Sequence, residues 1–409
     1  MKRFKPVRLL SSTLFILAAL LPAGPLAGQT ASAPVFTQWI DSEGSQMTAH
    51  EPLAFSRPLQ IWEASRLQPA KQLPQEAGSS RICIIVHQNI YQAVYAGLDQ
   101  YERDLAAQGF SVLTLEYASG SPEEIRSYLM GRYEEPESLS GAVVIGEIPY
   151  ILYEMMCDYG MGDQYDDFPC DLFYMDLDGI WSDSLDQGQV RANNGKYDTR
   201  SGNLEAEIWV SRMKTANLNS LGSEDTILNG YFSKNHRYRV GDMVPAKKAL
   251  SYIDDDWALM APEDTANLAD LYGDGNVVTV SDPEQTTAPD YISNHLPAAY
   301  ELMLLRSHGT PENHGFYQNN KMWMDFVFSN DYRTTKPMAL FYSLFVCSGA
   351  DYTAANNLAG TVAFNLDDSG LLAWGSTKTG GMWGDEHFYN ALIEGEVFGE
   401  AFRLPISEE

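Results

Sequence analysis

An alternation of apolar, β-rich runs with helical patterns begins at residue 81 and constrains the fold more than any other feature of the sequence. RICIIVH is followed by an amphipathic stretch at 91–108, and SVLTLEYA by SPEEIRSYLMGRYEE with its serine and glutamate capping signal; GAVVIGEIPY ends the series. Nearly continuous apolar strands that alternate with helices are typical of a parallel sheet covered on both faces. We therefore predict an α/β fold with mostly parallel sheets flanked by helices.

The same pattern restarts later in the chain. A polar, aspartate-rich insert at 154–205 is followed by the apolar run EIWVSRM and a helical segment near 223–240, and five more apolar runs lie between 247 and 377. A chain of 409 residues is too long for one small core and suits two medium units. We predict an N-terminal α/β subdomain at 81–240 and a second α/β subdomain at 241–409.

The first 33 residues have the layout of a secretory signal peptide. Four basic residues precede an apolar run at 14–21 and small residues that end at Ala33. The apolar run is too short to span about 30 Å of hydrocarbon. We expect residues 1–33 to direct export and to be removed, which gives a secreted or periplasmic protein without a membrane anchor. Residues 34–80 show little periodicity and form either a pro-segment or a surface wrap.

The chain is strongly acidic. Its formal net charge is −28 at pH 7, and removal of residues 1–33 would change this to −32, because they hold four basic residues and no acidic one. An acidic surface repels nucleic acid and anionic membranes, so we expect neither as a partner. It suits cationic substrates or bound calcium, although acidity in secreted proteins also serves solubility.

Three predicted strands of the second unit end in groups that can carry chemistry. These strand ends are the aspartates at 254–256, His308-Gly309 and Cys347-Ser348-Gly349. In open parallel sheets the reactive groups gather at the carboxyl ends of the strands, so we expect the three to meet. An imidazole can take the proton of a thiol, and a carboxylate can orient that imidazole. The backbone N–H groups of Gly309 and Cys347 are candidates for an oxyanion hole.

Taken singly, each of these groups has an ordinary explanation. A cysteine in an apolar run is usually a small buried hydrophobe, and an aspartate triplet is usually a solvated turn. The order of motifs adds weight, because it resembles that of the gingipain-type cysteine peptidases, which have a caspase-like architecture. The matching strands are LLRSHG and SLFVCSG, with 39 residues from His308 to Cys347. GAVVIGEIPY, CDLFYMDLDGIW, AEIWVSRM and GLLAWGSTKTGGMW also resemble family segments, in the same order, over about 81–400.

The resemblance implies a cysteine endopeptidase that acts on protein or peptide substrates. His308 matches the family's catalytic histidine and Cys347 its nucleophile. Asp256 lies near the orienting carboxylate, which is a glutamate in the best-known members, so Asp255 and Asp254 are alternatives.

The resemblance also implies where substrate binds. Trp383 falls where the family places an aromatic lid over the primary specificity pocket. Glu263, Asp264 and Asp270 are candidates for a carboxylate that would favour Arg or Lys at the cleaved bond.

Two departures from the family are visible. Val346 precedes the nucleophile where the familiar motif has alanine, and the chain stops at Glu409 without the family's immunoglobulin-like and C-terminal sorting domains. We therefore expect ordinary export rather than the specialised route of well-known members.

No cofactor is required by this chemistry, but the insert offers hard oxygen ligands. Asp176, Asp178 and Asp183 have a calcium-like spacing without the third alternate ligand and the distal glutamate of an EF-hand, so a structural calcium competes with a solvated acidic loop.

The four cysteines allow several pairings. Cys157 and Cys170 are close enough in sequence for a local disulfide, whereas Cys83 and Cys347 lie in or at the end of apolar runs.

Two other functions remain open. One is a metal-dependent hydrolase that uses His308, Glu312 and His314, although their spacing matches no standard zinc motif. The other is a non-catalytic binding protein on the same fold. The oligomeric state is not predicted.

Overall fold

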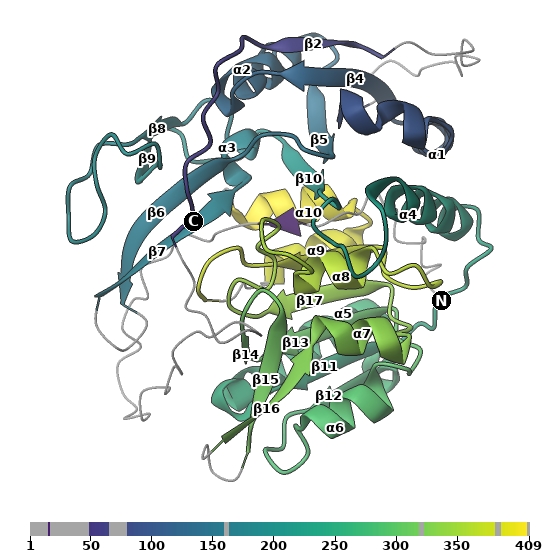
Figure 1. Ribbon diagram of the computed structural model, residues 1–409. Helices are drawn as coiled ribbons and strands as arrows, with labels where there is room; N and C mark the ends of the chain where they lie inside the picture. Colours follow the sequence, from purple (N-terminus) through teal and green to yellow (C-terminus); the bar gives the residue numbers. More distant parts are fainter. Residues whose placement is uncertain are drawn as a thin grey trace.

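The computed structural model describes residues 15–16, 49–64, 80–158, 163–318, 323–380 and 386–406. Within these residues the strands form two large sheets and three small ones, and helices pack against the large sheets (Figure 1). The protein is thus a mixed α/β protein with parallel-rich sheets flanked by helices, and the predicted fold class is confirmed at that level.

The first large sheet has its strands in the spatial order β10, β5, β3, β4 and β2, of which β2 runs antiparallel to β4 and the others are parallel. Residues 82–86 of β3 are fully buried, as expected for a central strand between two helical layers. Helix α1 contacts β4, and α2 contacts β5. The bounds are β2 Gln60–Glu63, β3 Arg81–His87, α1 Gln88–Ala107, β4 Ser111–Ser119, α2 Pro122–Tyr133, β5 Leu139–Ile145 and β10 Trp209–Met213.

The predicted capping signal sets the start of α2. Ser121 Oγ accepts the backbone N–H of Glu124 at 3.3 Å, and Glu124 Oε2 accepts the backbone N–H of Ser121 at 2.9 Å. Pro122 follows in the first turn, where its missing N–H would have had no helical partner. The capping box is confirmed.

The second large sheet has the order β1, β18, β17, β13, β11 and β12, and all of these pairings are parallel. Helix α5 contacts β11 and β12 on one side, and α8 contacts β17 and β18. The strands are β1 Phe15–Ile16, β11 Ala249–Ile253, β12 Val277–Val280, β13 Leu302–Arg306, β17 Phe341–Phe345 and β18 Leu372–Gly375. The helices are α5 Ala261–Tyr272, α6 Ala288–Asp290, α7 Ser329–Thr335, α8 Leu358–Ala363, α9 Glu386–Glu394 and α10 Phe398–Ile406, with short turns η1 Asp255–Met260, η2 Asp274–Asn276 and η3 Tyr291–His295.

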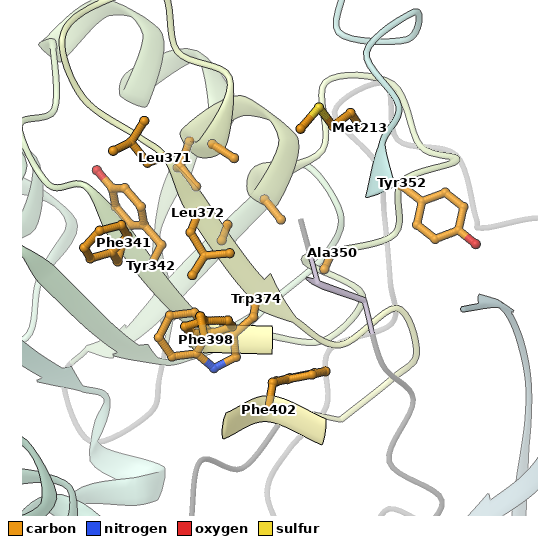
Figure 2. Packing of buried hydrophobic residues seen from close by; sticks show 14 of the residues in the cluster. Met213, Phe341, Tyr342, Ala350, Tyr352, Leu371, Leu372, Trp374, Phe398 and Phe402 are labelled. Atoms are coloured by element: carbon orange, nitrogen blue, oxygen red, sulfur yellow. The ribbon is translucent and has the colours of Figure 1, made fainter. Parts of the chain in front are cut away.

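Aromatic side chains pack between the second sheet and the C-terminal helices. The ring of Trp374 on β18, 1% exposed, lies 4.9 Å from that of Phe398 on α10 (Figure 2). Helix α10 also reaches the first sheet, because a Cβ on Gly399 would lie 2.6 Å from the ring of Trp209 on β10. A glycine is therefore required where α10 joins the two sheets.

Helix α4, Glu224–Arg239, lies between the two sheets as well (Figure 1). It packs on α1 of the first unit, and its buried Lys234 donates to the carbonyls of Ala363 and Ser369 in the second unit, at 3.1 and 2.7 Å. Burial lowers the pKa of Lys234 to about 7. The chain passes from the first sheet to the second between residues 213 and 249.

Two antiparallel hairpins were not predicted by the alternation. One occupies the start of the aspartate-rich insert, and the other follows the strand end at His308. Their strands are β6 Ile151–Asp158 with β7 Asp163–Cys170, and β14 His308–Gly309 and β15 Asn313–Gln318 with β16 Trp323–Phe328. The insert continues through α3 Leu172–Met175, β8 Ile180–Ser182 and β9 Thr199–Ser201. Buried Arg212 fixes the end of the first hairpin by donating to both carboxylate oxygens of Asp171, each at 2.8 Å.

The first hairpin rules out the local disulfide. Cys170 pairs with Ile151 and Cys157 pairs with Gln164, so the two cysteines lie at opposite ends of the hairpin, roughly 20 Å apart at about 3.3 Å per residue. All four cysteines are free thiols. The Cys157–Cys170 pairing, which sequence distance alone allowed, is therefore excluded by the hairpin geometry.

Part of the N-terminal extension lies against the first unit: residues 60–63 form β2 at the edge of the first sheet. The described stretches of the chain contain no helix that is both long and apolar enough to cross a membrane. Apart from residues 15–16, the expected signal peptide lies outside the described residues.

Candidate active site

Four neighbouring strands of the second sheet bring the predicted groups to one edge. The strands lie in the order β18, β17, β13 and β11, and because they are parallel their carboxyl ends meet. Directly after them come residues 376–380, Cys347, His308 and the aspartates at 254–256. The spatial order of the strands therefore becomes the spatial order of the reactive groups.

The register places His308 beside Cys347. Arg306 pairs with Phe345 in the β13–β17 ladder, and the N–H of Ser307 donates to the carbonyl of Phe345 at 3.1 Å. His308 and Cys347 each lie two residues beyond these paired strand ends. Their backbones consequently lie side by side at the carboxyl edge of the sheet.

His308 is held by a carboxylate and two aromatic rings. Its Nε2 lies 2.6 Å from Oδ2 of Asp256, and the two side chains are only 8% and 9% exposed. The rings of Trp257 and Tyr317 lie 4.5 and 5.1 Å from the imidazole, centroid to centroid. Asp256 and Trp257 both belong to the η1 turn that follows β11. Of the three candidate aspartates, Asp256 thus has the geometry of the orienting residue.

Asp254 has a different, structural role. Its backbone N–H donates to the carbonyl of Arg306 at 2.9 Å, and its Oδ1 accepts the backbone N–H of Tyr317 at 3.0 Å. It therefore ties β11 to β13 and to the hairpin strand β15. Burial and then the negative charge of Asp255 raise the pKa of Asp254 to about 8.

We expect stability to fall as the pH rises through the titration of Asp254. Its carboxyl group has an ordinary pKa of 3.8 in the unfolded chain and about 8 in the folded protein. Between these values the folded protein binds the additional proton, so raising the pH removes stability until the loss is complete above about pH 8. Asp254→Asn, which resembles the neutral acid, should flatten this dependence. Thermal unfolding of both proteins between about pH 5 and about pH 9 measures it, and parallel curves would contradict the assignment.

Cys347 sits before a strained turn at the end of β17. Ser348 has a φ of 52°, in the left-handed region that non-glycine residues rarely adopt. The backbone N–H of Gly380 donates to Cys347 Sγ at 3.3 Å. Burial raises the pKa of the Cys347 thiol, and the negative charge of Asp166 raises it further. The hydrogen bond from the Gly380 N–H and the positive charge of Lys378 lower the pKa, but they do not outweigh burial. A thiol of raised pKa is protonated at neutral pH and needs a base to become a nucleophile.

The backbone N–H of Gly309 points in the direction that an oxyanion hole requires. Thr310 N–H donates to Asn313 O at 2.8 Å, so the next pair of this antiparallel ladder, Gly309 with His314, is a non-hydrogen-bonded pair. The Gly309 N–H therefore points away from β15, toward the side where β17 ends. A Cβ at Gly309 would lie 2.4 Å from Asn313 O and 2.5 Å from Val346 Cγ1, so packing also requires glycine here.

The three acids proposed for a specificity pocket have different surroundings on α5. Asp264 is 2% exposed, and its two oxygens accept from Arg306 Nε and Nη2 at 2.5 and 2.6 Å. Its carboxylate is therefore used inside the protein, and the expectation that it binds a substrate cation is corrected. Asp270 is exposed in the last turn of α5, about 10 Å further along the helix axis than Glu263 at about 1.5 Å per residue, away from the strand ends. Glu263 is exposed in the first turn, nearest the edge.

Asp264→Ala is expected to destabilise the protein by about 3–5 kcal/mol, because it leaves the Arg306 guanidinium buried without its carboxylate. Urea unfolding measures this loss. Glu263→Gln, on the same helix turn but exposed, should change stability by less than about 0.5 kcal/mol. Unchanged stability in Asp264→Ala would show that the ion pair is not structural.

Two further residues predicted from the sequence are Trp383, for substrate binding, and His314, for metal binding. Trp383 lies outside the described residues. His314 is fully buried, and its Nε2 lies 2.8 Å from the hydroxyl of Tyr332. Because His314 pairs with Gly309, it points to the face of the hairpin opposite to His308. The structure therefore does not join His308, Glu312 and His314 into a metal site.

Of the three calcium-like aspartates of the insert, Asp176 is engaged by cations of the protein itself. Asp176 is fully buried and accepts from Arg200 Nε at 2.6 Å and from Trp181 Nε1 at 3.0 Å. The acids within 4.8 Å of one another are Asp176, Asp178 and Glu207, without Asp183, whose Oδ2 accepts the N–H of Gly195. As arranged, the predicted set does not fit a calcium ion, because an arginine holds its central carboxylate.

Four residues of the site were missed from the sequence. They are Trp257 beside His308, Lys378 and Asp166 near Cys347, and His50, which is described below. Only Trp257 could have been found from the sequence, because it directly follows the aspartate triplet. The others come from loops or from the aspartate-rich insert, where sequence alone gives no spatial neighbour.

The chain matches no protein-family model, and no curated protein matches it significantly.

Proposed function

We propose that the chain is a secreted or periplasmic cysteine endopeptidase of the gingipain type, on a caspase-like α/β fold. The observation that carries the proposal is the order of the strand ends. Cys347, His308 and Asp256 follow three neighbouring parallel strands, and Asp256 Oδ2 lies 2.6 Å from His308 Nε2. A thiol, an imidazole and an orienting carboxylate in this sequence are the three parts of nucleophilic catalysis by cysteine.

The proposed reaction follows from these positions. With Asp256 on Nε2, the other ring nitrogen of His308 takes the proton of Cys347, and the sulfur bonds to the scissile carbonyl carbon. The backbone N–H groups of Gly309 and Cys347 hold the oxyanion. His308 then protonates the leaving amine as the C–N bond breaks, which leaves an acyl-enzyme. Water, deprotonated by His308, attacks the acyl carbon, and the Cys347 thiol is restored.

The proposed substrates are proteins or peptides with Arg or Lys at the cleaved bond. The net charge of −28 favours approach of cationic segments. Glu263 is the remaining candidate on α5 for contact with the substrate cation, since it is exposed near the strand ends.

Inhibitors can separate the proposed function from its rivals in one assay. The reduced protein is incubated with a mixed peptide library, and cleavage sites are read by mass spectrometry. We expect cleavage after Arg or Lys that iodoacetamide abolishes and a chelator leaves intact. Cleavage that survives iodoacetamide would overturn the proposal. Absence of cleavage would favour a binding protein on this fold.

A metal-dependent hydrolase is the second candidate, on a set of ligands different from that expected from the sequence. Asp254, Asp256 and His308 present ligand atoms within 4.8 Å of one another. The hydrogen bond between Asp256 and His308 already joins two of these groups, which favours the cysteine mechanism. In the same assay, loss of cleavage with the chelator alone would support the metal reaction.

A further inference from the structure

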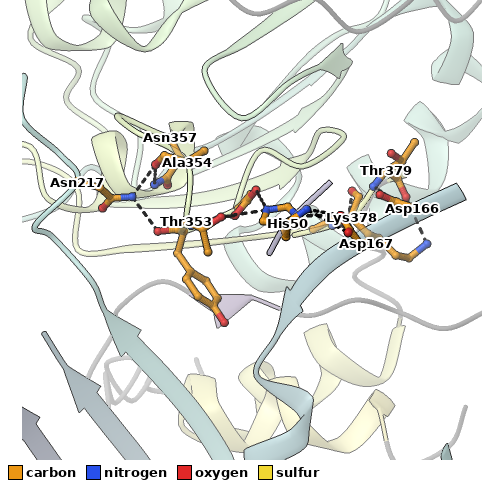
Figure 3. A network of polar contacts seen from close by, with 12 residues as sticks. His50, Asp166, Asp167, Asn217, Thr353, Ala354, Asn357, Lys378 and Thr379 are labelled. Atoms are coloured by element: carbon orange, nitrogen blue, oxygen red, sulfur yellow. Dashed lines mark hydrogen bonds and ion pairs between the residues drawn. The ribbon is translucent and has the colours of Figure 1, made fainter. Parts of the chain in front are cut away.

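A hairpin of the first unit is linked to two loops of the second unit, the loop that follows Cys347 and the loop that follows β18 (Figure 3). Asp166 on β7 accepts the backbone N–H of Thr379 at 2.8 Å, in the loop after β18. The next residue, Asp167, lies 2.9 Å from His50 Nδ1, and His50 Nε2 lies 3.2 Å from Asp351, in the loop after Cys347. Strand β7 is thus fastened to the second unit through two neighbouring aspartates.

The Asp167 contacts are strongly charged. Burial alone would lower the pKa of His50, but its hydrogen bonds to Asp167 and Asp351 outweigh burial and raise the pKa to about 10. Lys196 Nζ also donates to Asp167. His50 hence stays protonated at neutral pH and holds β7 beside the active edge.

The loop that Asp166 contacts is in turn fastened to the turn after Cys347. The N–H of Ser348 donates to Lys378 O at 2.8 Å, and the N–H of Ala350 donates to Ser376 O at 3.0 Å. Thr379 directly precedes Gly380 in this loop. The Thr379 N–H donates to Asp166, and the Gly380 N–H donates to the Cys347 sulfur. Only one peptide unit separates the two contacts.

We propose that Asp166 is a positioning residue for Cys347: by accepting the Thr379 N–H, its carboxylate holds the 376–380 loop so that the Gly380 N–H points at the sulfur. This inference rests on the proposed function, in which Cys347 is the reacting group. With this role for Asp166, the aspartate-rich insert of the first unit contributes a residue to the active site.

Two charged groups act on the Cys347 thiol, Asp166 from β7 and Lys378 from the loop after β18, and the titratable His308 follows the neighbouring strand β13. Asp166 is 5% exposed, and burial raises its pKa. In its ionised form it acts on Cys347 in two ways, through the position of the Gly380 N–H and through its charge, which raises the pKa of the thiol. Asparagine separates the two, because its amide oxygen still accepts a hydrogen bond while its charge is zero.

The test follows the alkylation rate of Cys347 by iodoacetamide against pH, in a Cys157→Ser background with peptide mapping. Cys83 and Cys170 are buried, so Cys347 is the reporting thiol. Asp166→Asn should shift the midpoint of the rate profile to lower pH. Asp166→Ala should have a midpoint above that of the asparagine variant, because it also loosens the Gly380 N–H, and its kcat for peptide cleavage should fall about tenfold with KM little changed. Asp186→Asn makes the same charge change on an exposed loop and should leave the midpoint unchanged.

Identical midpoints in the wild-type, asparagine and alanine proteins would overturn the inference, even if the alanine variant unfolds at a lower temperature, because that result describes a purely structural contact. Absence of Cys347 alkylation at any pH would overturn it as well. If the wild-type protein alkylates as expected but cleaves no peptide, the proposed function fails while the midpoints still decide the role of Asp166.

Discussion

Cys347→Ala is expected to lower kcat/KM for peptide cleavage by at least about ten-thousand-fold, because it removes the sulfur that forms the acyl-enzyme in the proposed mechanism. The substitution removes one sulfur atom from a half-buried position before the Ser348 turn, so the unfolding temperature should stay within a few degrees of the wild type. Cleavage rates and thermal unfolding measured on the same preparation give both quantities.

Cys157→Ser is the matched control for this variant. Cys157 is also a partly exposed free thiol, but it lies on the β6–β7 hairpin and belongs to none of the four strand ends. It should keep its activity. Full activity in Cys347→Ala, or equal loss in both variants, would mean that the reaction does not use the Cys347 sulfur.

Asp256→Asn should produce the second largest effect, a loss of about a hundred- to ten-thousand-fold in kcat/KM. The carboxylate accepts a hydrogen bond from the N–H at Nε2 of His308 and so leaves the other nitrogen able to take the thiol proton. An amide can donate to Nε2 instead, which stabilises the wrong tautomer. The pH profile of kcat/KM, measured together with its maximum, records the change.

Asp254→Asn provides the comparison for Asp256→Asn. It makes the same carboxyl-to-amide substitution two residues away, but Asp254 bonds to the backbone N–H of Tyr317 rather than to His308. We expect it to lose less than about tenfold in kcat/KM. A larger loss of kcat/KM in Asp254→Asn than in Asp256→Asn would mean that Asp254 is the residue that orients His308. Recovery of activity in either variant after addition of metal ions would favour the metal-dependent hydrolase.

The fold was predictable where a sequence pattern is compatible with only one type of secondary structure. Runs such as ICIIV at 82–86 are apolar on both faces, which only a covered strand tolerates, and Ser121 with Glu124 marks a helix start by its own hydrogen bonds. The hairpins were missed for the opposite reason. Strand β7, DQYDDFPC, has the composition of a solvated loop, and it is held as a strand by distant partners such as His50 and Lys196.

The candidate site, too, could be predicted only in part from the sequence. His308, Cys347 and the aspartate triplet could be grouped from sequence, because parallel strands place their carboxyl ends together whatever the loops do. The sequence could not choose Asp256 over its neighbours, because one residue in the η1 turn changes the direction of a side chain. Nor could it show that Asp264 faces Arg306, since the two are 42 positions apart and meet only after β11 and β13 pair.

Labelling with an arginyl or lysyl chloromethylketone tests the central claim most directly. The reduced protein is treated with the reagent, and the adduct is located by intact mass and peptide mapping. The proposed mechanism predicts one adduct per chain, on Cys347, that is lost in Cys347→Ala and strongly slowed in Asp256→Asn. Absence of an adduct, or an adduct on Cys157 in place of Cys347, would contradict it.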